Sequence, residues 1–482
     1  MYHNVRMNRR NFMKLSGAFT ATLALNACSM PDSSKGKPAE QPNIILCMCD
    51  DLGWGDVGYH GTNKEIKTPH LDEMAANSLQ FRRFYAGAPV CSPTRGSVIT
   101  GRHPYRYGIF FANAGHMKSQ ELTLAEALKP LNYRTGHFGK WHLGTLTKTI
   151  KDGRRGGKPN NDEHYSPPWE NGFDECFSTE QAVPTWNPME NQKIPTRYWT
   201  GPGQSVPSDD ETLKGDDSRV IMDRVIPFIR NTAKQEQSFL AVVWFHTPHS
   251  PVVAGPEYKA MYSGHDDDHQ HYYGCITAMD EQIGRLRNVL KEAGIADNTM
   301  LWFTSDNGPA GQGGGIKQSS GGRQQGSPGP FRGRKGSLYE GGVRVPGLLE
   351  WPARIKTPRI TEVPCCTIDY FPTTMAALGY TPKDAVKPID GINLLALIDG
   401  NMEKRPVPIA FQSKEQQSLS DNRYKLYSSN KGKSYELYDL IDDPYEKKDI
   451  AAMHPEIVAL MKQTLEAWIE SCSKSNNGED YE

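Results

Sequence analysis

Three apolar runs, each followed at once by acidic or histidine side chains, constrain the fold of this chain more than any other feature. The runs cover residues 43–49, 239–245 and 299–304, and they end in Asp50-Asp51, His246-Thr247-Pro248-His249 and Ser305-Asp306-Asn307-Gly308. Each run has the length and the continuous apolar character of a strand that is buried on both faces. The sequence therefore predicts three core strands with polar, chemically active residues at their carboxyl ends.

Amphipathic helical patterns lie between these runs, over residues 68–78, 121–129, 216–233 and 272–293. Alternating strands and helices predict an α/β fold in which helices cover both faces of a mostly parallel sheet. Ligands of such sheets bind at the carboxyl ends of the strands. Because all three runs end there in groups that bind metals or transfer protons, we expect one composite site at that edge.

The C-terminal part of the chain shows a different pattern. Beyond Asn401, short alternating strands over residues 423–427 and 435–440 precede a helical pattern over residues 455–472. We therefore expect a catalytic domain over 43–400 and a small α+β subdomain over 401–482. Two Gly-rich stretches, residues 147–171 and 310–330, are predicted to be loops that either shape a substrate cleft or are mobile.

The N-terminus has the features of an export signal. Arg9-Arg10-Asn11-Phe12-Met13-Lys14 looks like a twin-arginine motif, and an apolar run over residues 15–27 follows it. Leu25-Asn26-Ala27-Cys28 resembles the lipobox of bacterial lipoproteins, which implies cleavage before Cys28 and its lipidation. A plain cleaved signal peptide is the alternative. We expect a signal peptide over 1–27, a polar tether over 28–42, and a lipid-anchored protein in the periplasm or at the outer membrane or cell surface.

Charge and cysteine content restrict the partners of the chain. Lys and Arg (55) nearly balance Asp and Glu (56), which argues against a nucleic-acid partner. An anionic substrate must then be recognised by a local group of cations. Cys47 and Cys49 alternate within an apolar run and are expected in the core. The other cysteines lack zinc-site spacing, and the sequence does not settle any disulfide pairing.

The most specific segment is Cys91-Ser92-Pro93-Thr94-Arg95-Gly96-Ser97, which opens a helical pattern. It resembles the signature of type I sulfatases, in which a maturating enzyme converts the cysteine to formylglycine (3-oxoalanine). In that family one hydroxyl of the hydrated aldehyde attacks sulfur, and the other later expels sulfate. The resemblance implies that Cys91 is the modified nucleophile and Arg95 a catalytic cation. A buried cysteine near a helix N-terminus is the alternative interpretation of so short a pattern.

The acidic strand ends match the metal site of the same family. Asp50, Asp51, Asp306 and Asn307 correspond to its four oxygen ligands, and modified Cys91 would be the fifth. An all-oxygen site suits a hard cation, Ca²⁺ or Mg²⁺, and not the thiol- or imidazole-rich sites of zinc. The resemblance favours one Ca²⁺ ion. By itself, the Asp50-Asp51 pair would be interpreted as a turn or a helix cap.

Three further segments are similar to the family's motifs and follow its order. Gly139-Lys140-Trp141-His142-Leu143-Gly144 implies that Lys140 binds sulfate oxygens, that His142 accepts a proton and that Trp141 packs in the core. Lys140 and His142 alternate, so an extended backbone would direct both to one side. In residues 246–251 the match falls on His249, the expected donor to the leaving oxygen, with His246 supporting it. Residues 333–346 imply that Lys335 is the second sulfate-binding cation.

The resemblance extends from about Pro42 to the segment around Asp443-Pro444. It implies an alkaline-phosphatase-like fold and hydrolysis of sulfate esters by electrostatic stabilisation. A phosphonate or phosphate ester hydrolase of the same superfamily is one alternative, and a catalytically dead glycan-binding lipoprotein is another.

For an exported sulfatase we expect a sulfated polysaccharide or its oligosaccharides as substrate, either an algal glycan (ulvan, carrageenan, fucoidan) or a glycosaminoglycan. Four aromatic residues in a loop-rich region are candidates for stacking on sugars, although packing is the expected role for most of them: Trp169, Trp186, Tyr198 and Trp199.

Overall fold

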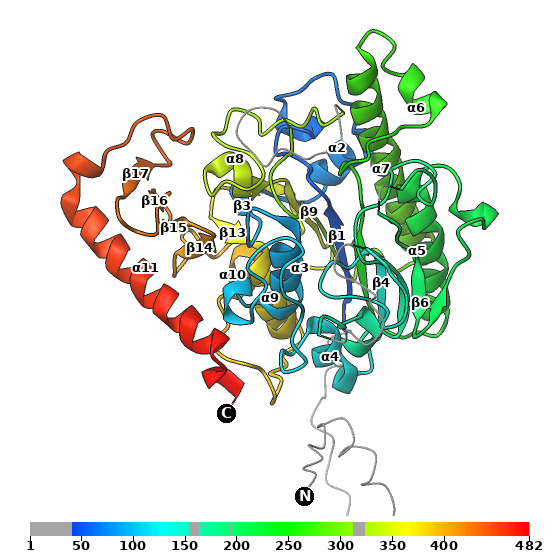
Figure 1. Cartoon of the computed structure of the whole chain (residues 1–482), viewed down its shortest axis with the longest axis horizontal. Helices are drawn as coiled ribbons and strands as arrows, with labels where there is room; N and C mark the ends of the chain where they lie inside the picture. The colour runs from blue at the N-terminus through cyan, green and yellow to red at the C-terminus, as the bar shows by residue number, and fades with distance from the viewer. Residues whose placement is uncertain (1–40, 154–162, 193, 312–322, 482) are drawn as a thin grey trace, which may run out of the picture. The chain divides into compact units, whose positions relative to one another are not determined.

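A ten-stranded sheet forms the centre of the molecule (Figure 1). The computed structural model describes residues 41–481 except 154–162, 193 and 312–322. In spatial order the strands are β12 (Arg359–Thr361), β2 (Leu79–Phe81), β11 (Gly347–Glu350), β9 (Thr299–Ser305), β1 (Asn43–Cys49), β8 (Phe239–Trp244), β4 (Arg134–Lys140), β5 (Glu175–Thr179), β6 (Trp199–Gly201) and β7 (Gln204–Ser205). The adjacent strands β9, β1, β8, β4 and β5 are parallel, whereas β11, β6 and β7 pair antiparallel with their neighbours. The predicted mostly parallel sheet is confirmed.

Helices cover both faces of this sheet. The elements packed on one face are α2 (Pro69–Ala76), α5 (Asp217–Lys234) and α7 (Asp267–Glu292), and those on the other are α3 (Cys91–Thr100), α4 (Leu124–Leu128), α9 (Tyr370–Ala377) and α10 (Leu395–Ile398). Strand β1 shows why both faces need a cover. Its Ile45, Cys47 and Cys49 belong to one apolar core, while Ile44 and Leu46 belong to the other. Successive side chains of a strand point to opposite faces, so a continuous apolar run requires apolar cover on both. The predicted core position of Cys47 and Cys49 is confirmed.

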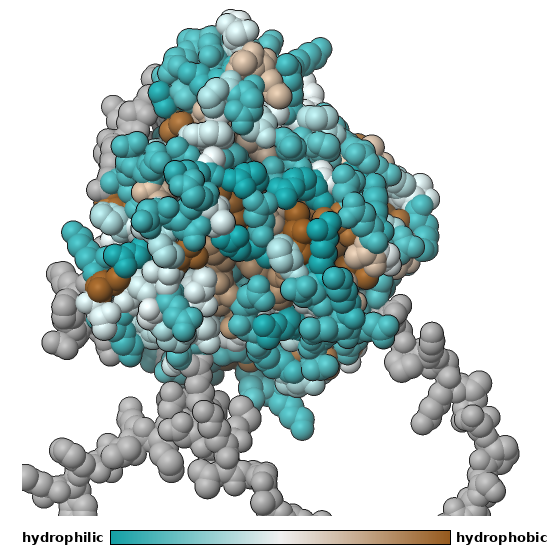
Figure 2. Space-filling model, turned by 90° about the vertical axis from the view of Figure 1, so that its right-hand side faces the viewer, coloured by the Kyte–Doolittle hydropathy of each residue, from teal (hydrophilic) through white to brown (hydrophobic). Residues whose placement is uncertain are grey.

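The outer side of the helical layer is polar. Figure 2 shows the side on which α5, α7 and the short helix α6 (Pro256–Ala260) lie in Figure 1, and hydrophilic residues dominate it with only scattered hydrophobic ones. This follows from amphipathic helices that turn their apolar side chains toward the sheet. Among the described residues, no helix combines the length and the apolar character needed to cross a membrane.

The C-terminal region forms a separate antiparallel sheet. Its strands are β14 (Ile409–Ser413), β15 (Gln416–Ser420), β16 (Tyr424–Ser428) and β17 (Glu436–Asp439), followed by α11 (Pro455–Asn476). Leu426 and Leu437 pack toward Leu465 of α11, whereas Phe411 on the opposite face packs with Leu338. The same hydrophobic cluster includes residues of α8 (Glu340–Val343) and of a small three-stranded sheet. The strands of this sheet are β10 (Arg344–Val345), β3 (Phe84–Tyr85) and β13 (Cys365–Cys366). The predicted α+β subdomain is confirmed, while its boundary at residue 401 stays a prediction.

Several predictions fall on residues outside the described ranges. These are the signal peptide over 1–27, most of the tether over 28–42, and the lipidation of Cys28. The two Gly-rich stretches are described in part. Those parts are mostly turns, bends and irregular segments, with one short 3-10 helix, Pro168–Glu170, and isolated bridges such as that between Gly311 and Gln325. Within the described residues all eight cysteines are free thiols.

Candidate active site

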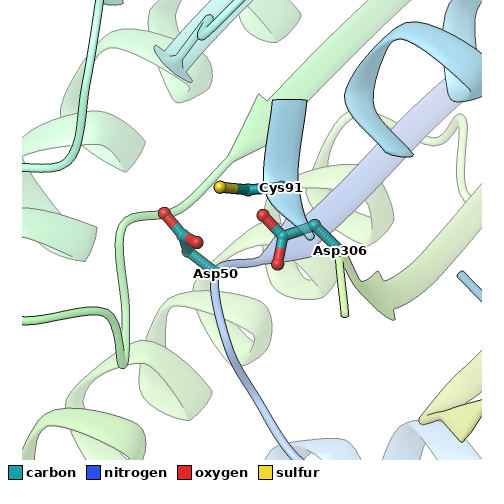
Figure 3. Close-up of side chains that lie close together, drawn as sticks. All are labelled: Asp50, Cys91 and Asp306. Atoms are coloured by element: carbon teal, nitrogen blue, oxygen red, sulfur yellow. The ribbon is translucent and has the colours of Figure 1, made fainter. Parts of the chain in front are cut away.

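The strand order brings the polar strand ends together. Neighbouring parallel strands end at the same edge, so Asp306 after β9, Asp50 after β1, His246 after β8 and Lys140 at the end of β4 become neighbours. Cys91 joins them from a different element, the first residue of α3. Figure 3 shows the Cys91 thiol pointing between two carboxylates, and one ligand atom from each of Asp50, Cys91 and Asp306 lies within 4.8 Å of the others. The predicted composite site therefore exists as an arrangement of side chains.

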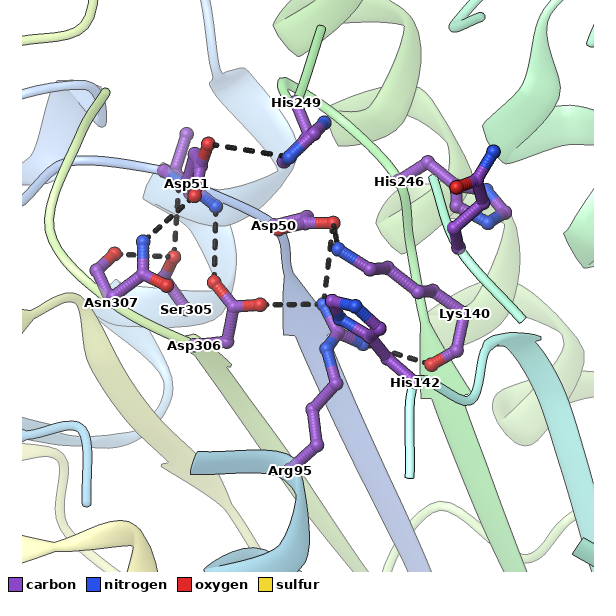
Figure 4. Close-up of polar contacts among 12 residues, drawn as sticks. Asp50, Asp51, Arg95, Lys140, His142, His246, His249, Ser305, Asp306 and Asn307 are labelled. Atoms are coloured by element: carbon purple, nitrogen blue, oxygen red, sulfur yellow. Dashed lines mark hydrogen bonds and ion pairs between the residues drawn. The ribbon is translucent and has the colours of Figure 1, made fainter. Parts of the chain in front are cut away.

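Arg95 lies one helical turn after Cys91, and this spacing places both side chains on the same face of α3. The guanidinium is fully buried; its Nη2 donates to Asp306 Oδ2 at 2.6 Å and lies 3.5 Å from Asp50 Oδ2. Its Nη1 donates to the Lys140 carbonyl at 3.0 Å. Arg95 thus ties together the ends of β1, β9 and β4 (Figure 4). Its guanidinium also lies over the Trp244 ring, 5.2 Å from the ring centroid. The catalytic role of Arg95 stays a prediction.

The two carboxylates that follow β1 are paired with lysine side chains. Asp50 Oδ2 accepts from Lys140 Nζ at 2.6 Å, and Asp51 Oδ1 accepts from Lys335 Nζ at 2.6 Å. The backbone of Asp51 turns sharply, with a φ of 70°, and its N–H donates to Asp306 Oδ1 at 3.1 Å. This left-handed conformation is uncommon for a side-chain-bearing residue, though Asp tolerates it better than most. The turn allows two consecutive acids to take part in one site.

Burial and mutual charge shift the acidity of these groups. Burial and the charge of Asp50 raise the pKa of Asp306 to about 7, although Arg95 acts in the opposite direction. Burial would also raise the pKa of Asp50, but Lys140 and then His249 hold it well below its usual value. Carboxylates this close repel one another in a medium of low dielectric constant. The site therefore favours one more positive charge.

Two buried oxygen atoms are available to bind a positively charged ligand. Asp50 Oδ1 and Asn307 Oδ1 have no hydrogen-bond partner among the described residues. The amide of Asn307 is fixed, because its Nδ2 donates to Asp51 Oδ1 at 2.8 Å and to the Gly308 carbonyl at 2.9 Å. Buried polar atoms normally have a partner, so these two mark a place for a ligand. Oxygen donors from Asp50, Asp51, Asp306 and Asn307 fit a hard divalent cation such as Ca²⁺.

His249 follows β8 and has a defined tautomer. Its Nδ1 is 2.7 Å from the Ser250 carbonyl, and because a carbonyl only accepts, Nδ1 carries the hydrogen. Its Nε2 then faces the site, 3.9 Å from Asp51 Oδ2. Burial lowers the pKa of His249 to about 4, partly offset by Asp50.

The backbone at His142 follows a course that the sequence did not indicate. The expected extended backbone through His142 is wrong, because β4 ends at Lys140 and His142 adopts a φ of 57°. The chain bends at this point, and Trp141 is fully buried. The backbone N–H of Trp141 donates to the Thr179 carbonyl at 2.9 Å. The packing role of Trp141 is confirmed. His142 Nε2 lies 2.7 Å from Asn113 Oδ1, a partner that no motif marked.

His246 lies behind the site, as expected for a supporting residue. It is fully buried, with Nδ1 2.7 Å from Asp217 Oδ2 and Nε2 2.8 Å from Thr179 Oγ1. The His246 carbonyl accepts from the N–H of His249 at 2.7 Å, so the pair with Asp217 at the start of α5 helps to fix the turn that carries His249. Asp217 was not found from the sequence, because an acid at a helix start is interpreted as a cap.

The four aromatic candidates for sugar stacking divide by burial. Tyr198 and Trp199 are buried in the cores, and Trp169 packs against one core while partly exposed. The expected packing role is confirmed for these three. Trp186 is partly exposed and lies against Gly215 and Gly255.

Comparison with known proteins finds one enzyme family over most of the chain. The sulfatase family model matches residues 42–380, and the model of the C-terminal region of N-sulphoglucosamine sulphohydrolase matches residues 331–471. Human N-acetylgalactosamine-6-sulfatase is 32% identical over 395 residues, a match that covers 78% of this chain and 69% of the relative.

Solved structures show the same likeness. The structure of Ps i-CgsB in complex with k-i-k-neocarrahexaose superposes with a TM-score of 0.73 at 25% identity, covering 89% of this chain and 92% of that one. A sulfatase from the metabolism of multiple glycosaminoglycans in Bacteroides thetaiotaomicron gives a TM-score of 0.73 at 26% identity, covering 89% and 99%. These likenesses confirm the predicted alkaline-phosphatase-like fold. The chain therefore belongs to the type I sulfatase family and is a sulfuric ester hydrolase.

Proposed function

We propose that this sulfatase removes sulfate from a sulfated polysaccharide or its oligosaccharides, with Cys91 oxidised to formylglycine and one Ca²⁺ ion bound beside it. The observation that carries the proposal is the convergence of the Cys91 thiol with Asp50 and Asp306, at an edge where Lys140 and Lys335 also point inward. A sulfate ester is a small tetrahedral anion. Its hydrolysis needs a nucleophile and fixed positive charges around one point.

The calcium ion would be held by the oxygens of Asp50, Asp51, Asp306 and Asn307, together with the oxidised side chain of Cys91. When bound, it would supply a Lewis-acid centre that neutralises sulfate oxygens and favours an ionised oxygen nucleophile. Oxidation replaces the sulfur of Cys91 with oxygen, which suits the same hard-donor set. A formylglycine-generating or sulfatase-maturating enzyme is therefore a required partner.

Lys140 and Lys335 would bind the sulfate oxygens directly. Each ammonium group has three N–H donors, and the pairs with Asp50 and Asp51 leave donors for a ligand. Both side chains are almost fully buried, so their charges are held in place before the substrate arrives. Such preorganised charge stabilises a transition state without the cost of reorganising solvent. Arg95 would contribute indirectly, by fixing Asp306 and the carbonyl of Lys140.

The two histidines would divide the proton transfers. At His142 the Asn113 carbonyl oxygen accepts from Nε2–H, so Nδ1 is the basic nitrogen of the neutral ring. We assign to it the proton released when sulfate is expelled. At His249 the Nε2 atom faces Asp51 and the site. Because burial lowers the pKa of His249 to about 4, the ring is neutral at neutral pH, and Nε2 would donate to the leaving oxygen only after the ring has taken up a proton.

The substrate class is supported by the names of the relatives and by the N-terminal sequence. The relatives are an N-acetylgalactosamine-6-sulfatase, a protein in complex with a neocarrahexaose, and a protein of glycosaminoglycan metabolism. The export signal and the lipobox-like Cys28 favour a lipid-anchored enzyme at a bacterial membrane, where polysaccharides are accessible. A glycosaminoglycan or an algal glycan such as carrageenan, ulvan or fucoidan is the proposed source of the sulfate ester.

The test is a comparison of kcat/KM on nitrophenyl sulfate, nitrophenyl phosphate, a phosphonate ester and a panel of sulfated oligosaccharides. We expect hydrolysis of at least one sulfated sugar, and a preference for the aryl sulfate over the aryl phosphate of about 100-fold or more. A preference for phosphate or phosphonate would instead assign the chain to ester hydrolases of phosphorus. Glycan binding without turnover, in protein whose Cys91 is shown to be oxidised, would make it a glycan-binding protein.

A further inference from the structure

We propose that Gln416, the first residue of β15 in the C-terminal sheet, is a positioning residue for Lys335. Its Nε2 donates to the Gly336 carbonyl at 2.7 Å, and its Oε1 accepts from the Leu338 N–H at 3.0 Å. The two hydrogen bonds grip the backbone that directly follows Lys335. This inference rests on the proposed sulfate contact of Lys335 and concerns how that contact is held in place.

The backbone around Lys335 lacks regular structure of its own. Residues 332–338 lie between the described end of the second Gly-rich stretch and α8. They contain one turn and no helix or strand, so no strand ladder or helix fixes them. The Lys335 N–H donates to the Pro309 carbonyl at 3.2 Å, and the Gly336 N–H donates to the Pro89 carbonyl at 2.8 Å. These contacts join the loop to the segments that carry Asn307 and Cys91. The opposite side of the loop is held by the C-terminal sheet through Gln416.

Gln416 is itself held firmly. The Tyr427 hydroxyl donates to its Oε1 at 3.1 Å, and β15 pairs with both β14 and β16. The turn between β14 and β15 is anchored as well, because the backbone N–H of Lys414 donates to the Tyr105 hydroxyl oxygen at 2.8 Å. A carboxamide offers a donor and an acceptor at the same end of a side chain, which the Gly336 carbonyl and the Leu338 N–H require. Glutamate would offer acceptors only, and methionine neither strong donor nor strong acceptor.

A small displacement of this loop would reach the reacting centre. Lys335 Nζ is buried 2.6 Å from Asp51 Oδ1, so its ammonium group has little room to compensate for a shifted backbone. Misplacement of a binding group by about 1 Å costs on the order of 100-fold in rate. The C-terminal sheet therefore takes part in catalysis through a backbone contact, without touching the substrate at this point.

The experiment uses the full-length matured enzyme, with kcat/KM expressed per molecule of oxidised Cys91. Gln416→Met, which keeps the size and removes both hydrogen bonds, is expected to lower kcat/KM by about 10- to 100-fold. Gln416→Glu should be impaired at least as much, because a carboxylate would face the Gly336 carbonyl. The matched control is Gln412→Met on β14, whose side chain points to the opposite face from Phe411, and its kcat/KM should change by less than about twofold.

A double-mutant cycle with Lys335→Met separates positioning from other roles. If Gln416 acts through Lys335, adding Gln416→Met to Lys335→Met should lower kcat/KM by less than about twofold further. Inhibition by free sulfate should weaken in the Gln416→Met single variant, which a loss of folded protein alone would not produce. Fully multiplicative effects would overturn the positioning role and leave the role of Lys335 intact. An unchanged kcat/KM in Lys335→Met would refute the proposed sulfate contact, and the inference with it.

Discussion

The described part of the molecule contains two clusters of buried charge that differ in function. The site cluster consists of Asp50, Asp51, Asp306, Arg95, Lys140 and Lys335. The junction cluster, between the main domain and the C-terminal sheet, consists of Glu340, Arg344, Lys425 and Glu446. In the junction cluster Lys425 Nζ lies 3.0 Å from both Glu340 Oε1 and Glu446 Oε1, and all three side chains are buried.

The clusters differ in how their charges are completed. Glu340 Oε2 accepts from the Tyr85 hydroxyl at 2.9 Å, and Glu446 Oε2 accepts from the Glu340 N–H at 2.7 Å. Glu340 Oε1 and Glu446 Oε1 both face Lys425 Nζ at 3.0 Å, although the contact at Glu446 Oε1 is an ion pair and not a hydrogen bond. Each acidic oxygen of Glu340 and Glu446 therefore lies next to a donor or a cation of the chain. In the site cluster Asp50 Oδ1 has no such partner among the described residues.

Raised pKa values do not distinguish the clusters, because burial raises the pKa of Glu446 to about 7 just as it does that of Asp306. Incomplete coordination at the carboxyl edge of the sheet is what marks the functional cluster. The comparison implies that substitutions in the site cluster change activity, while substitutions in the junction cluster change stability.

The largest effect is expected at Cys91, which touches the site cluster but is no part of either charge network. Cys91→Ser should reduce kcat by at least about 1,000-fold, because the nucleophile is removed while substrate contacts remain. The temperature of unfolding should stay close to that of the wild type. Steady-state kinetics and calorimetry on the same preparation measure both. Wild-type turnover by protein with an unmodified serine would contradict the proposed nucleophile.

Removal of the metal should come next in size. We expect chelation to abolish activity and added Ca²⁺ to restore it, because the donors of the site cluster are hard oxygens. Since a ligand that binds only the folded state stabilises it, Ca²⁺ at about 100 times its Kd should add about 2.7 kcal/mol to the free energy of unfolding. Titration followed by calorimetry measures this. Recovery with Zn²⁺, but with neither Ca²⁺ nor Mg²⁺, would refute the ligand assignment.

A matched pair of lysine substitutions tests the comparison itself. Lys425→Met leaves two buried acids without their shared cation and should cost about 3–5 kcal/mol in the free energy of unfolding. Lys140→Met leaves Asp50 next to Arg95, so its cost in stability should be smaller, while kcat/KM falls by about 100- to 1,000-fold. Denaturant unfolding and kinetics on the folded protein are the two measurements. Equal losses of stability in both variants would remove the distinction between the clusters.

The smallest expected effect is a ratio of two rates, and it tests His249, which lies next to Asp51 of the site cluster. Protonation of the leaving oxygen matters for a sugar alcohol and little for a nitrophenol, so His249→Ala should slow sugar-sulfate hydrolysis more than aryl-sulfate hydrolysis by about tenfold. His142→Ala should slow both substrates and allow sulfated enzyme to accumulate. Equal factors for both substrates in His249→Ala would make His249 a simple sulfate contact.

The sequence predicts those parts of the fold that have continuous apolar patterns. The predicted bounds of the three core strands differ from β1, β8 and β9 by at most one residue at an end. Strand β4 was not predicted as a strand because its sequence contains Gly136, His137 and Gly139. Gly139 has a φ of 101°, and a Cβ there would lie 1.9 Å from the Trp244 carbonyl oxygen. The close packing of β4 against β8 therefore requires glycine at this position, although glycine in a sequence argues against a strand. The edge strands are too short to show any period.

The residues of the site also fall into those that the sequence predicts and those that it does not. Residues within motifs, such as Cys91 and Lys335, were found, and the acids at the strand ends were found because buried strands have a clear pattern. Asn113 and Gln416 were not found, because each is defined only by a contact with a segment distant in the sequence. Such contacts follow from tertiary packing, and a single sequence contains no local signal for them.

The central claim is that the Cys91 side chain reacts only after oxidation. The most direct measurement is mass spectrometry of the peptide that contains Cys91, made on enzyme produced with and without a maturating enzyme, with activity measured on the same samples. The predicted result is an aldehyde at Cys91 whose occupancy is proportional to kcat across the samples. Full activity in a sample whose Cys91 is entirely an unmodified thiol would contradict it.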